Sequence, residues 1–407
     1  MTRYIYTSFL ILFSIISNAQ WTEYNTSNSQ LPNNTVRCIA FDHDSTAWVG
    51  TDFGLVKIKN GMFTVYNTAN SGIPDDAIRC ITVDSLNRKW IGTFLGGFTV
   101  YNDTVWENYS TSSSPLPDDQ VKDIQFDANR TVWLATTGGL VSIDSSLVWK
   151  ISVQFSSPLQ SSNIARIYID PTDNLKIVGT VNGGLSLVDD TSITTYTISN
   201  SGIADNSLYD IDVDAAGNYW MASPANGIVV KTNGFGWTNF SPFNSGISTP
   251  SLTCLEFDDE EKLWIGSIDS GLIVKDGLVF KSWNTTNSPM LDNYVECLSF
   301  APDGKLWMGT YSAGLYVVDT AALFTNINSF EPQHFSVYPV PAVDQVWIRI
   351  NSTNFIYEIT DALGNIIETK KIKGSSDPIN VSTYVPGIYF VRINTGDGWL
   401  SQKLIKK

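Results

Sequence analysis

Histidine is nearly absent from this chain of 407 residues, which contains only His43 and His334. Because imidazole is the commonest general acid or base and a frequent metal ligand, most histidine-based catalytic and metal chemistry is excluded. Basic residues are also few: 25 Lys and Arg stand against 40 Asp and Glu, and the net charge is −15. Nucleic acid is therefore not an expected partner, since its binding requires Lys and Arg at the phosphates.

Long hydrophobic runs are also missing. The one extended apolar stretch, residues 6–16, follows Arg3 and precedes Ser17, Asn18 and Ala19. This order predicts a signal peptide over residues 1–19 that is cleaved after Ala19. A transmembrane anchor is the alternative, but the run is short for a bilayer. No other stretch is apolar enough to cross a membrane, so we expect an exported protein without a transmembrane segment after cleavage.

What the sequence has in abundance is a repeat. The tetrapeptide Trp48-Val49-Gly50-Thr51 recurs about every 43 residues. Its copies begin at Trp48, Trp90, Trp133, Ile177, Trp220, Trp264 and Trp307. An alternating strand precedes each copy, an Asp turn lies before each of the first six, and a third and a fourth strand follow. Four short strands per repeat are typical of one β-propeller blade. Helical repeats would show a 3.6-residue period, which is absent.

The two ends of the array predict how the ring closes. The seventh copy lacks an aromatic fourth strand after Asp319, whereas an unassigned fourth-strand motif occupies residues 21–24, before the first copy. We expect this N-terminal strand to complete the last blade, because such a closure removes the open edge between the first and last blades. The alternative is that residues 323–327 form the missing strand. The predicted fold is all-β, with a seven-bladed β-propeller over residues 20–325.

The repeat resembles a known family. The series Leu-Pro-x-x-x-Val, Ile-x-x-Asp, Trp-Ile-Gly-Thr and Gly-Gly-Leu is similar to the two-component-regulator propeller repeat, over about three-quarters of the chain. That family includes periplasmic sensor domains of hybrid histidine kinases in Bacteroidetes, and stand-alone secreted proteins. This chain has no kinase or response-regulator segment. The resemblance therefore implies the propeller and not the sensor role.

A different pattern follows a polar linker, residues 326–334. Tyr338-Pro339-Val340-Pro341 precedes an alternating strand, and two further strand motifs and a basic end follow. These short strands predict a small Ig-like β-sandwich over residues 335–407. The motifs resemble the type A C-terminal sorting domain of the type IX secretion system, with Val340 where Asn is usual. The resemblance implies handling by the type IX machinery, followed by release or attachment at the cell surface.

Candidate ligand residues lie in two sets of loops that gather at one face of a propeller. The loops that lead from a fourth strand to the next first strand carry Asp75, Asp76, Asp118, Asp119, Asp205 and Asp292. This broken ring could hold a divalent cation or sugar hydroxyls, although Asp is also an ordinary turn residue. The loops between second and third strands carry Phe53, Phe94 and Tyr311, on blades that are neighbours in the closed ring. These aromatic rings either stack on a sugar or protein ligand or fold over neighbouring loops.

A third candidate set occupies one position of the innermost strand. Blade by blade, this position holds Cys38, Cys80, Asp123, Arg166, Asp210, Cys254 and Cys297. The four cysteines lie on contiguous blades, as buried thiols or as disulfides, and an exported protein permits either state. Arg166 stands between Asp123 and Asp210, which predicts a structural ion triad or a polar channel site for a charged ligand.

These features favour binding over catalysis. The first hypothesis is a secreted or surface-attached binding module with a carbohydrate or protein ligand. The alternatives are an extracellular carbohydrate-active enzyme, a lyase or hydrolase on a propeller scaffold, and a stand-alone sensing propeller with a separate signalling partner. No catalytic residue is assigned, no cofactor is expected unless the carboxylate ring holds a divalent cation, and a monomer is expected.

Overall fold

The computed structural model describes residues 21–154, 156–234, 236–277, 279–325, 336–349, 354–361, 366–373, 378–394 and 399–407. The expected signal peptide, residues 1–19, and the expected linker, residues 326–334, lie outside these ranges. The chain divides into two compact units, Met1–Leu323 and Phe324–Lys407. Within the described ranges, no helix combines the length and the apolar character that crossing a bilayer requires.

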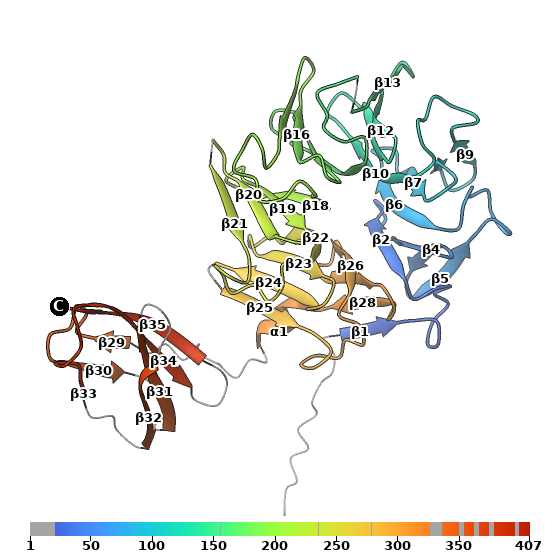
Figure 1. Ribbon diagram of the computed structural model, residues 1–407. Helices are drawn as coiled ribbons and strands as arrows, with labels where there is room; N and C mark the ends of the chain where they lie inside the picture. Colours follow the sequence, from blue (N-terminus) through green and yellow to red (C-terminus); the bar gives the residue numbers. More distant parts are fainter. Residues whose placement is uncertain are drawn as a thin grey trace, which may run out of the picture. The chain divides into compact units, whose positions relative to one another are not determined.

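The first unit is a ring of seven four-stranded antiparallel sheets, which are the blades of a β-propeller (Figure 1). Four consecutive strands form each of the first six blades, and the first strand of each lies innermost. Blades one to three comprise β2 (Val36–Phe41), β3 (Ala47–Thr51), β4 (Gly54–Lys59) and β5 (Met62–Tyr66); β6 (Ile78–Val83), β7 (Lys89–Thr93), β8 (Phe98–Tyr101) and β9 (Trp106–Tyr109); and β10 (Val121–Phe126), β11 (Val132–Thr136), β12 (Gly139–Ile143) and β13 (Trp149–Ser152).

The remaining blades repeat the same order. Blades four to six comprise β14 (Ile164–Ile169), β15 (Lys176–Thr180), β16 (Leu185–Val188) and β17 (Ile193–Tyr196); β18 (Asp210–Val213), β19 (Tyr219–Ser223), β20 (Gly227–Lys231) and β21 (Trp237–Phe240); and β22 (Leu252–Phe257), β23 (Leu263–Ser267), β24 (Leu272–Asp276) and β25 (Val279–Trp283). Blade seven comprises β26 (Val295–Phe300), β27 (Leu306–Thr310), β28 (Leu315–Val318) and β1 (Trp21–Tyr24).

Strand β1 closes the ring, as the sequence predicts. It pairs antiparallel with β28, so that Trp21 lies opposite Val318 and Tyr24 lies opposite Leu315. The alternative of a strand over residues 323–327 is wrong, because Thr320–Thr325 forms helix α1. The inner strands β2 and β26 are in contact, so blades seven, one and two are neighbours.

The repeated Asp and Trp form one hydrogen-bonded unit within a blade. In blade one, Asp42 Oδ1 accepts hydrogen bonds from the backbone N–H groups of Asp44 and Thr46. The other oxygen, Oδ2, accepts a hydrogen bond of 3.0 Å from Trp48 Nε1. The same indole-to-carboxylate bond is present in blades two, three, five and six. The Asp therefore shapes the turn after the inner strand and satisfies the buried indole N–H at the same time.

Five of the seven tetrapeptides have a glycine at the third position, and this glycine sets the distance to the next blade. A Cβ atom at Gly50 would lie 2.4 Å from Cys38 Sγ and 2.6 Å from Cγ2 of Ile78, the first residue of the next inner strand. The first residues of the next blades obstruct a Cβ in the same way at Gly92, Gly266 and Gly309. Blades three and five have Ala135 and Ala222 at this position, so the need for a residue without a Cβ applies to the blades whose tetrapeptide contains glycine.

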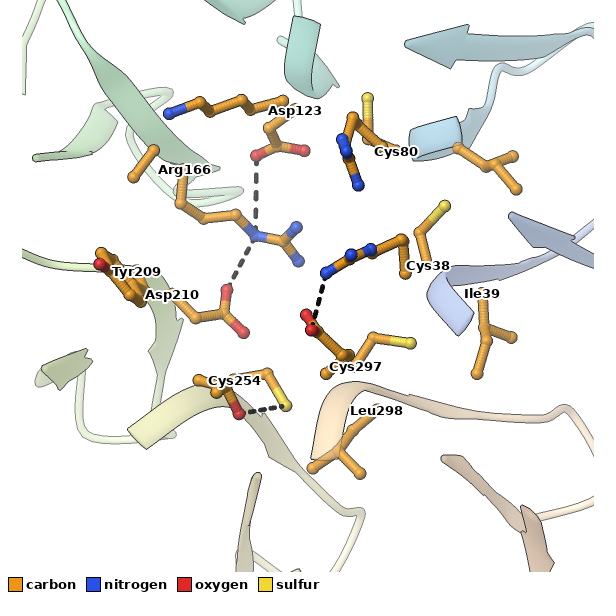
Figure 2. A pocket seen from close by; sticks show the side chains of 17 residues that line it. Cys38, Ile39, Cys80, Asp123, Arg166, Tyr209, Asp210, Cys254, Cys297 and Leu298 are labelled. Atoms are coloured by element: carbon orange, nitrogen blue, oxygen red, sulfur yellow. Dashed lines mark hydrogen bonds and ion pairs between the residues drawn. The ribbon is translucent and has the colours of Figure 1, made fainter. Parts of the chain in front are cut away.

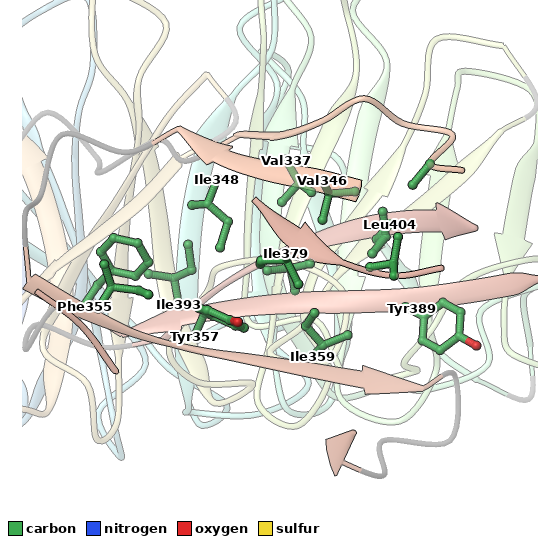
Figure 3. Packing of buried hydrophobic residues seen from close by; sticks show 14 residues of the cluster. Val337, Val346, Ile348, Phe355, Tyr357, Ile359, Ile379, Tyr389, Ile393 and Leu404 are labelled. Atoms are coloured by element: carbon green, nitrogen blue, oxygen red, sulfur yellow. The ribbon is translucent and has the colours of Figure 1, made fainter. Parts of the chain in front are cut away.

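The second unit is a β-sandwich, as the sequence predicts. A three-stranded sheet in the order β29-β30-β33 faces a four-stranded sheet in the order β32-β31-β34-β35. The strands are β29 (Ser336–Tyr338), β30 (Gln345–Arg349), β31 (Asn354–Asp361), β32 (Ile366–Lys373), β33 (Ile379–Asn380), β34 (Gly387–Asn394) and β35 (Trp399–Lys406). Figure 3 shows Val346, Ile359 and Leu404 in the single apolar core between the sheets, where each is fully buried.

The replacement Gly50→Ala tests the contact between blades. The new methyl group would overlap Cys38 and Ile78, so we expect the free energy of unfolding to fall by about 1–3 kcal/mol in denaturant titrations. Gly246→Ala is the matched control, because the nearest atom to its Cβ is 3.8 Å away. A Gly50→Ala protein as stable as the control would contradict the role assigned to this glycine.

Candidate functional site

An extra residue interrupts the pairing of the inner strand in most blades. In blade one, Val36 lies opposite Thr51 and Cys38 lies opposite Gly50, so Arg37 is the additional residue of a β-bulge. The same shift is present in β6, β10, β14, β22 and β26. Together with Tyr209 in blade five, the inserted residues form a ring at the mouth of the channel: Arg37, Arg79, Lys122, Ala165, Thr253 and Glu296.

This mouth ring encloses a polar pocket of about 190 Å³ (Figure 2). The next position along each inner strand, the one singled out from the sequence, forms its wall. Figure 2 shows Cys38, Cys80, Asp123, Arg166, Asp210, Cys254 and Cys297 around the pocket. The seven inner strands therefore place two consecutive rings of side chains at one end of the channel.

The expected ion triad is present in this wall. Arg166 Nε lies 2.8 Å from Asp210 Oδ1 and 3.7 Å from Asp123 Oδ2. Each carboxylate also accepts a hydrogen bond from the next blade, Asp123 from the Ile167 N–H at 2.9 Å and Asp210 from the Leu255 N–H at 2.8 Å. The charges of both carboxylates raise the pKa of Arg166. The triad thus joins blades three to six as well as lining the pocket.

The four cysteines are free thiols, and the alternative of disulfides is not realised in this structure. Two of the sulfur atoms point instead at backbone oxygens of the next blade. Cys80 Sγ lies 3.9 Å from Val121 O, and Cys297 Sγ lies 3.8 Å from Val36 O. Burial raises the pKa of all four thiols, so they stay protonated at neutral pH. They form an uncharged side of the pocket.

The three aromatic residues predicted from the loops lie at the rim of the mouth, on blades one, two and seven. Phe53 is 60% exposed, Tyr311 48% and Phe94 36%. The guanidinium carbon of Arg79 lies 4.6 Å from the ring centre of Phe94, and that of Arg37 lies 5.4 Å from the ring centre of Tyr311. Phe94 and Tyr311 are therefore held against arginine side chains of the mouth ring, while part of each ring faces solvent.

Asp52 connects these two arginines. Its Oδ1 accepts hydrogen bonds of 3.0 Å from Arg37 Nε and from Arg79 Nη1, and its Oδ2 accepts one of 2.9 Å from Arg37 Nη2. Arg37 Nη1 also contacts Glu296 Oε1 at 2.7 Å. Burial alone would raise the pKa of Asp52, but the hydrogen bonds and charges of the two arginines lower it below its usual value. Asp52 thus joins blades one and two, and the pair of Arg37 with Glu296 connects them to blade seven.

The loop carboxylates predicted as a ligand ring all take part in turns. Each accepts at least one hydrogen bond from a backbone N–H of its own or an adjacent loop: Asp75, Asp76, Asp118, Asp119, Asp205 and Asp292. Over the described ranges, no group of three or more His, Cys, Asp and Glu side chains is arranged to hold a metal ion. The geometry therefore supports the turn-forming role of these residues.

Two further carboxyl groups lie deeper along the inner strands. Asp212 Oδ2 accepts a hydrogen bond of 2.8 Å from the Phe257 N–H, and Glu256 Oε1 accepts one of 3.0 Å from the Phe300 N–H. Burial raises the pKa of Asp212 to about 6 and that of Glu256 to about 8. Both side chains bond one inner strand to the next, as the triad does.

The mouth ring and Asp52 were not identified from the sequence. The sequence does contain a sign of this ring. At the position just before the one held by Cys38, the first three blades have the basic residues Arg37, Arg79 and Lys122. Strict alternation along a strand places that position on the face opposite Cys38. The bulge is what brings both positions to the pocket.

Comparisons with known proteins agree with the two-part fold. Residues 336–407 match the secretion system C-terminal sorting domain, and residues 30–53 match the two component regulator propeller. One repeat of the propeller thus matches the two component regulator model, and the C-terminal unit matches a sorting domain that indicates export through the type IX system to the cell surface or the extracellular space. The search of curated proteins gave no match.

Several solved structures share the propeller fold. The extracellular domain of a hybrid two component system from B. thetaiotaomicron matches with a TM-score of 0.68 and 16% identity, over 95% of this chain and 57% of that one. PorZ, a surface component of the type-IX secretion system of Porphyromonas gingivalis, matches with a TM-score of 0.57 and 16% identity, over 91% of this chain and 59% of that one. Virginiamycin B lyase from Staphylococcus aureus matches with a TM-score of 0.59 and 14% identity, over 73% of this chain and 98% of that one. This chain thus spans less than two thirds of the first two proteins.

Glu256 is expected to make stability depend on pH. Its pKa is raised in the folded protein, so the native state holds a proton that the unfolded chain releases between about pH 4.5 and pH 8, and stability falls as the pH rises through this window. Glu256→Gln cannot ionise and keeps an acceptor for the Phe300 N–H. Between pH 5 and pH 8.5 we expect the wild type to lose on the order of 1–3 kcal/mol more stability than this variant, in urea titrations.

The control for this measurement is Glu107→Gln, on the exposed face of β9. It should show the same pH profile as the wild type. Equal profiles for Glu256→Gln and the wild type would mean that Glu256 does not bind the extra proton.

Proposed function

We propose that the exported propeller is a binding module and that it holds a glycan at the arc of blades seven, one and two. The observation that carries this proposal is the set of three exposed aromatic side chains, Phe53, Phe94 and Tyr311, around a network of two arginines and Asp52. Sugar rings pack on flat aromatic faces, and their hydroxyls require fixed donors and acceptors beside those faces. The arc offers both.

The arc is organised before any ligand arrives. Tyr311 stacks on Tyr294 with 5.1 Å between ring centres, and its backbone oxygen accepts a hydrogen bond of 2.7 Å from Thr35 Oγ1. The Phe94 N–H donates to Ala77 O at 2.9 Å. Because these loops are already ordered, little conformational entropy would be lost on binding.

A glycan suits this surface better than a protein does. A stable protein interface buries about 800 Å² on each partner and has an apolar centre. Here the three rings are separated by the charged side chains of Arg37, Asp52 and Arg79. Charged and aromatic groups in alternation favour a ligand with many hydroxyl groups and small apolar faces.

The lyase fold does not carry its activity over to this chain. A variant of virginiamycin B lyase in which one histidine is replaced by alanine is described as catalytically inactive. In this chain His43 lies in the turn between β2 and β3, at the end of the blade opposite the mouth. His334 lies outside the described ranges, and no histidine lines the mouth pocket. Binding is therefore the better supported function.

A glycan array probed with the purified chain tests the proposal. We expect that Phe94→Ala and Tyr311→Ala each weaken binding about fivefold, since an aromatic contact contributes about 1 kcal/mol, and that the triple variant with Phe53→Ala abolishes it. Phe243→Ala is the matched control, because Phe243 is 99% exposed on a loop of blade five, away from the arc.

Two results would count against this function. Glycan binding that is unchanged in the triple variant would place the site elsewhere. An array without signal, together with a purified protein partner whose binding depends on the same three residues, would make the arc a protein interface.

A further inference from the structure

The lining of the mouth pocket has a net charge opposite in sign to that of the whole chain. The whole chain carries −15, yet four of the seven charged side chains that line this pocket are cations. The cations are Arg37, Arg79, Lys122 and Arg166, and the acids are Asp123, Asp210 and Glu296. An acidic protein with a small cationic pocket selects for anions at that one place, since close charges dominate inside a cavity.

The acidic groups of the pocket are already engaged. Asp123 and Asp210 each accept a backbone hydrogen bond and face Arg166, and Glu296 pairs with Arg37. Burial also raises the pKa of Asp210 and of Glu296, although the arginines act against this rise. The acids therefore compete weakly with an incoming anion.

The cationic side chains, in contrast, have hydrogen-bond donors that are not used within the protein. Arg166 is held only through Nε, and among the described residues its Nη1 and Nη2 atoms donate to no protein acceptor. Its side chain is 40% exposed, and Figure 2 shows its guanidinium reaching toward the middle of the pocket. Arg79 donates to Asp52 through Nη1 alone, and Lys122 Nζ donates one bond, of 2.5 Å, to Asn163. Burial lowers the pKa of Lys122, and a bound anion would favour its charged form.

We propose that this pocket binds a compact oxyanion, a carboxylate, sulfate or phosphate group, between Arg166, Arg79 and Lys122. The two free Nη atoms of a guanidinium match two oxygens of such a group. A cavity of about 190 Å³ admits one oxyanion with a few waters. The inference deepens the proposed function and rests on it for the nature of the ligand, because the glycan on the adjacent arc would carry the oxyanion.

Thermal unfolding and calorimetry of the purified full chain test the pocket directly. Sulfate, phosphate and acetate are titrated to about 10 mM against chloride at constant ionic strength. We expect at least one of them to raise the melting temperature saturably, because it binds the native state alone. An equal effect of chloride and all three oxyanions on the wild type would overturn the proposal.

Matched variants locate the effect. Arg166→Lys keeps a positive charge beside Asp123 and Asp210 but loses the free guanidinium pair, and Lys122→Gln removes a cation without unpairing a buried acid. We expect each to weaken oxyanion binding at least fivefold. Lys150→Gln, on the outer strand β13, should bind as the wild type does. If Arg166→Lys is too unstable to measure, a wild-type dissociation constant in Lys122→Gln is enough to overturn the assignment.

The two proposals fail separately. If the array reports only neutral glycans whose binding needs the aromatic arc, the oxyanion inference is wrong and the binding function stands. If an oxyanion binds at Arg166 while the arc variants change no glycan signal, the pocket is assigned correctly and the glycan function is wrong.

Discussion

The close approach of each inner strand to the next is the constraint on which the rest of the propeller depends. In five blades it is made where a glycine, such as Gly50, meets the first inner-strand residue of the neighbouring blade, such as Ile78. The spacing of the inner strands also brings the carboxylates of Asp123 and Asp210 within hydrogen-bond distance of the backbone of the next blade. The pocket at the mouth follows from the same spacing, because seven inner strands at this distance leave room for about 190 Å³.

Many of the excess acidic residues of this chain have structural roles in the propeller. Some carboxylates shape turns, as Asp42 does beside its tryptophan, and others bond one inner strand to the next, as Glu256 does. Inner strands have an unpaired edge, and a side-chain acceptor can satisfy a backbone N–H there. The cations have another distribution, since Arg37, Arg79 and Lys122 gather on three consecutive blades at the mouth.

The sequence predicts the ring but only part of the site. Seven copies of one tetrapeptide and an unassigned strand at Trp21 are sufficient to predict the blade count and the closure, because both depend on local pattern and on counting. The triad around Arg166 is predictable for the same reason, since its three residues occupy the same position in consecutive repeats. The mouth ring is not, because a bulge that shifts Arg37 out of alternation leaves no mark in the pattern of apolar residues. The Asp52 network joins blades one, two and seven, and the raised pKa of Glu256 needs the burial that only the closed ring provides.

The pairing of β1 with β28 has a consequence for the order of assembly. Its partners lie about 300 residues apart in sequence, whereas the other strand pairs of the propeller are formed within single repeats. The entropy of closing a loop grows only with the logarithm of its length, so this late contact costs little more than a shorter one would. Single repeats can form early from local contacts, but the ring cannot shut until the strands of the seventh blade are available. The mouth pocket can therefore form only after the last repeat is present. A chain truncated before this repeat could form single blades but could not close the ring.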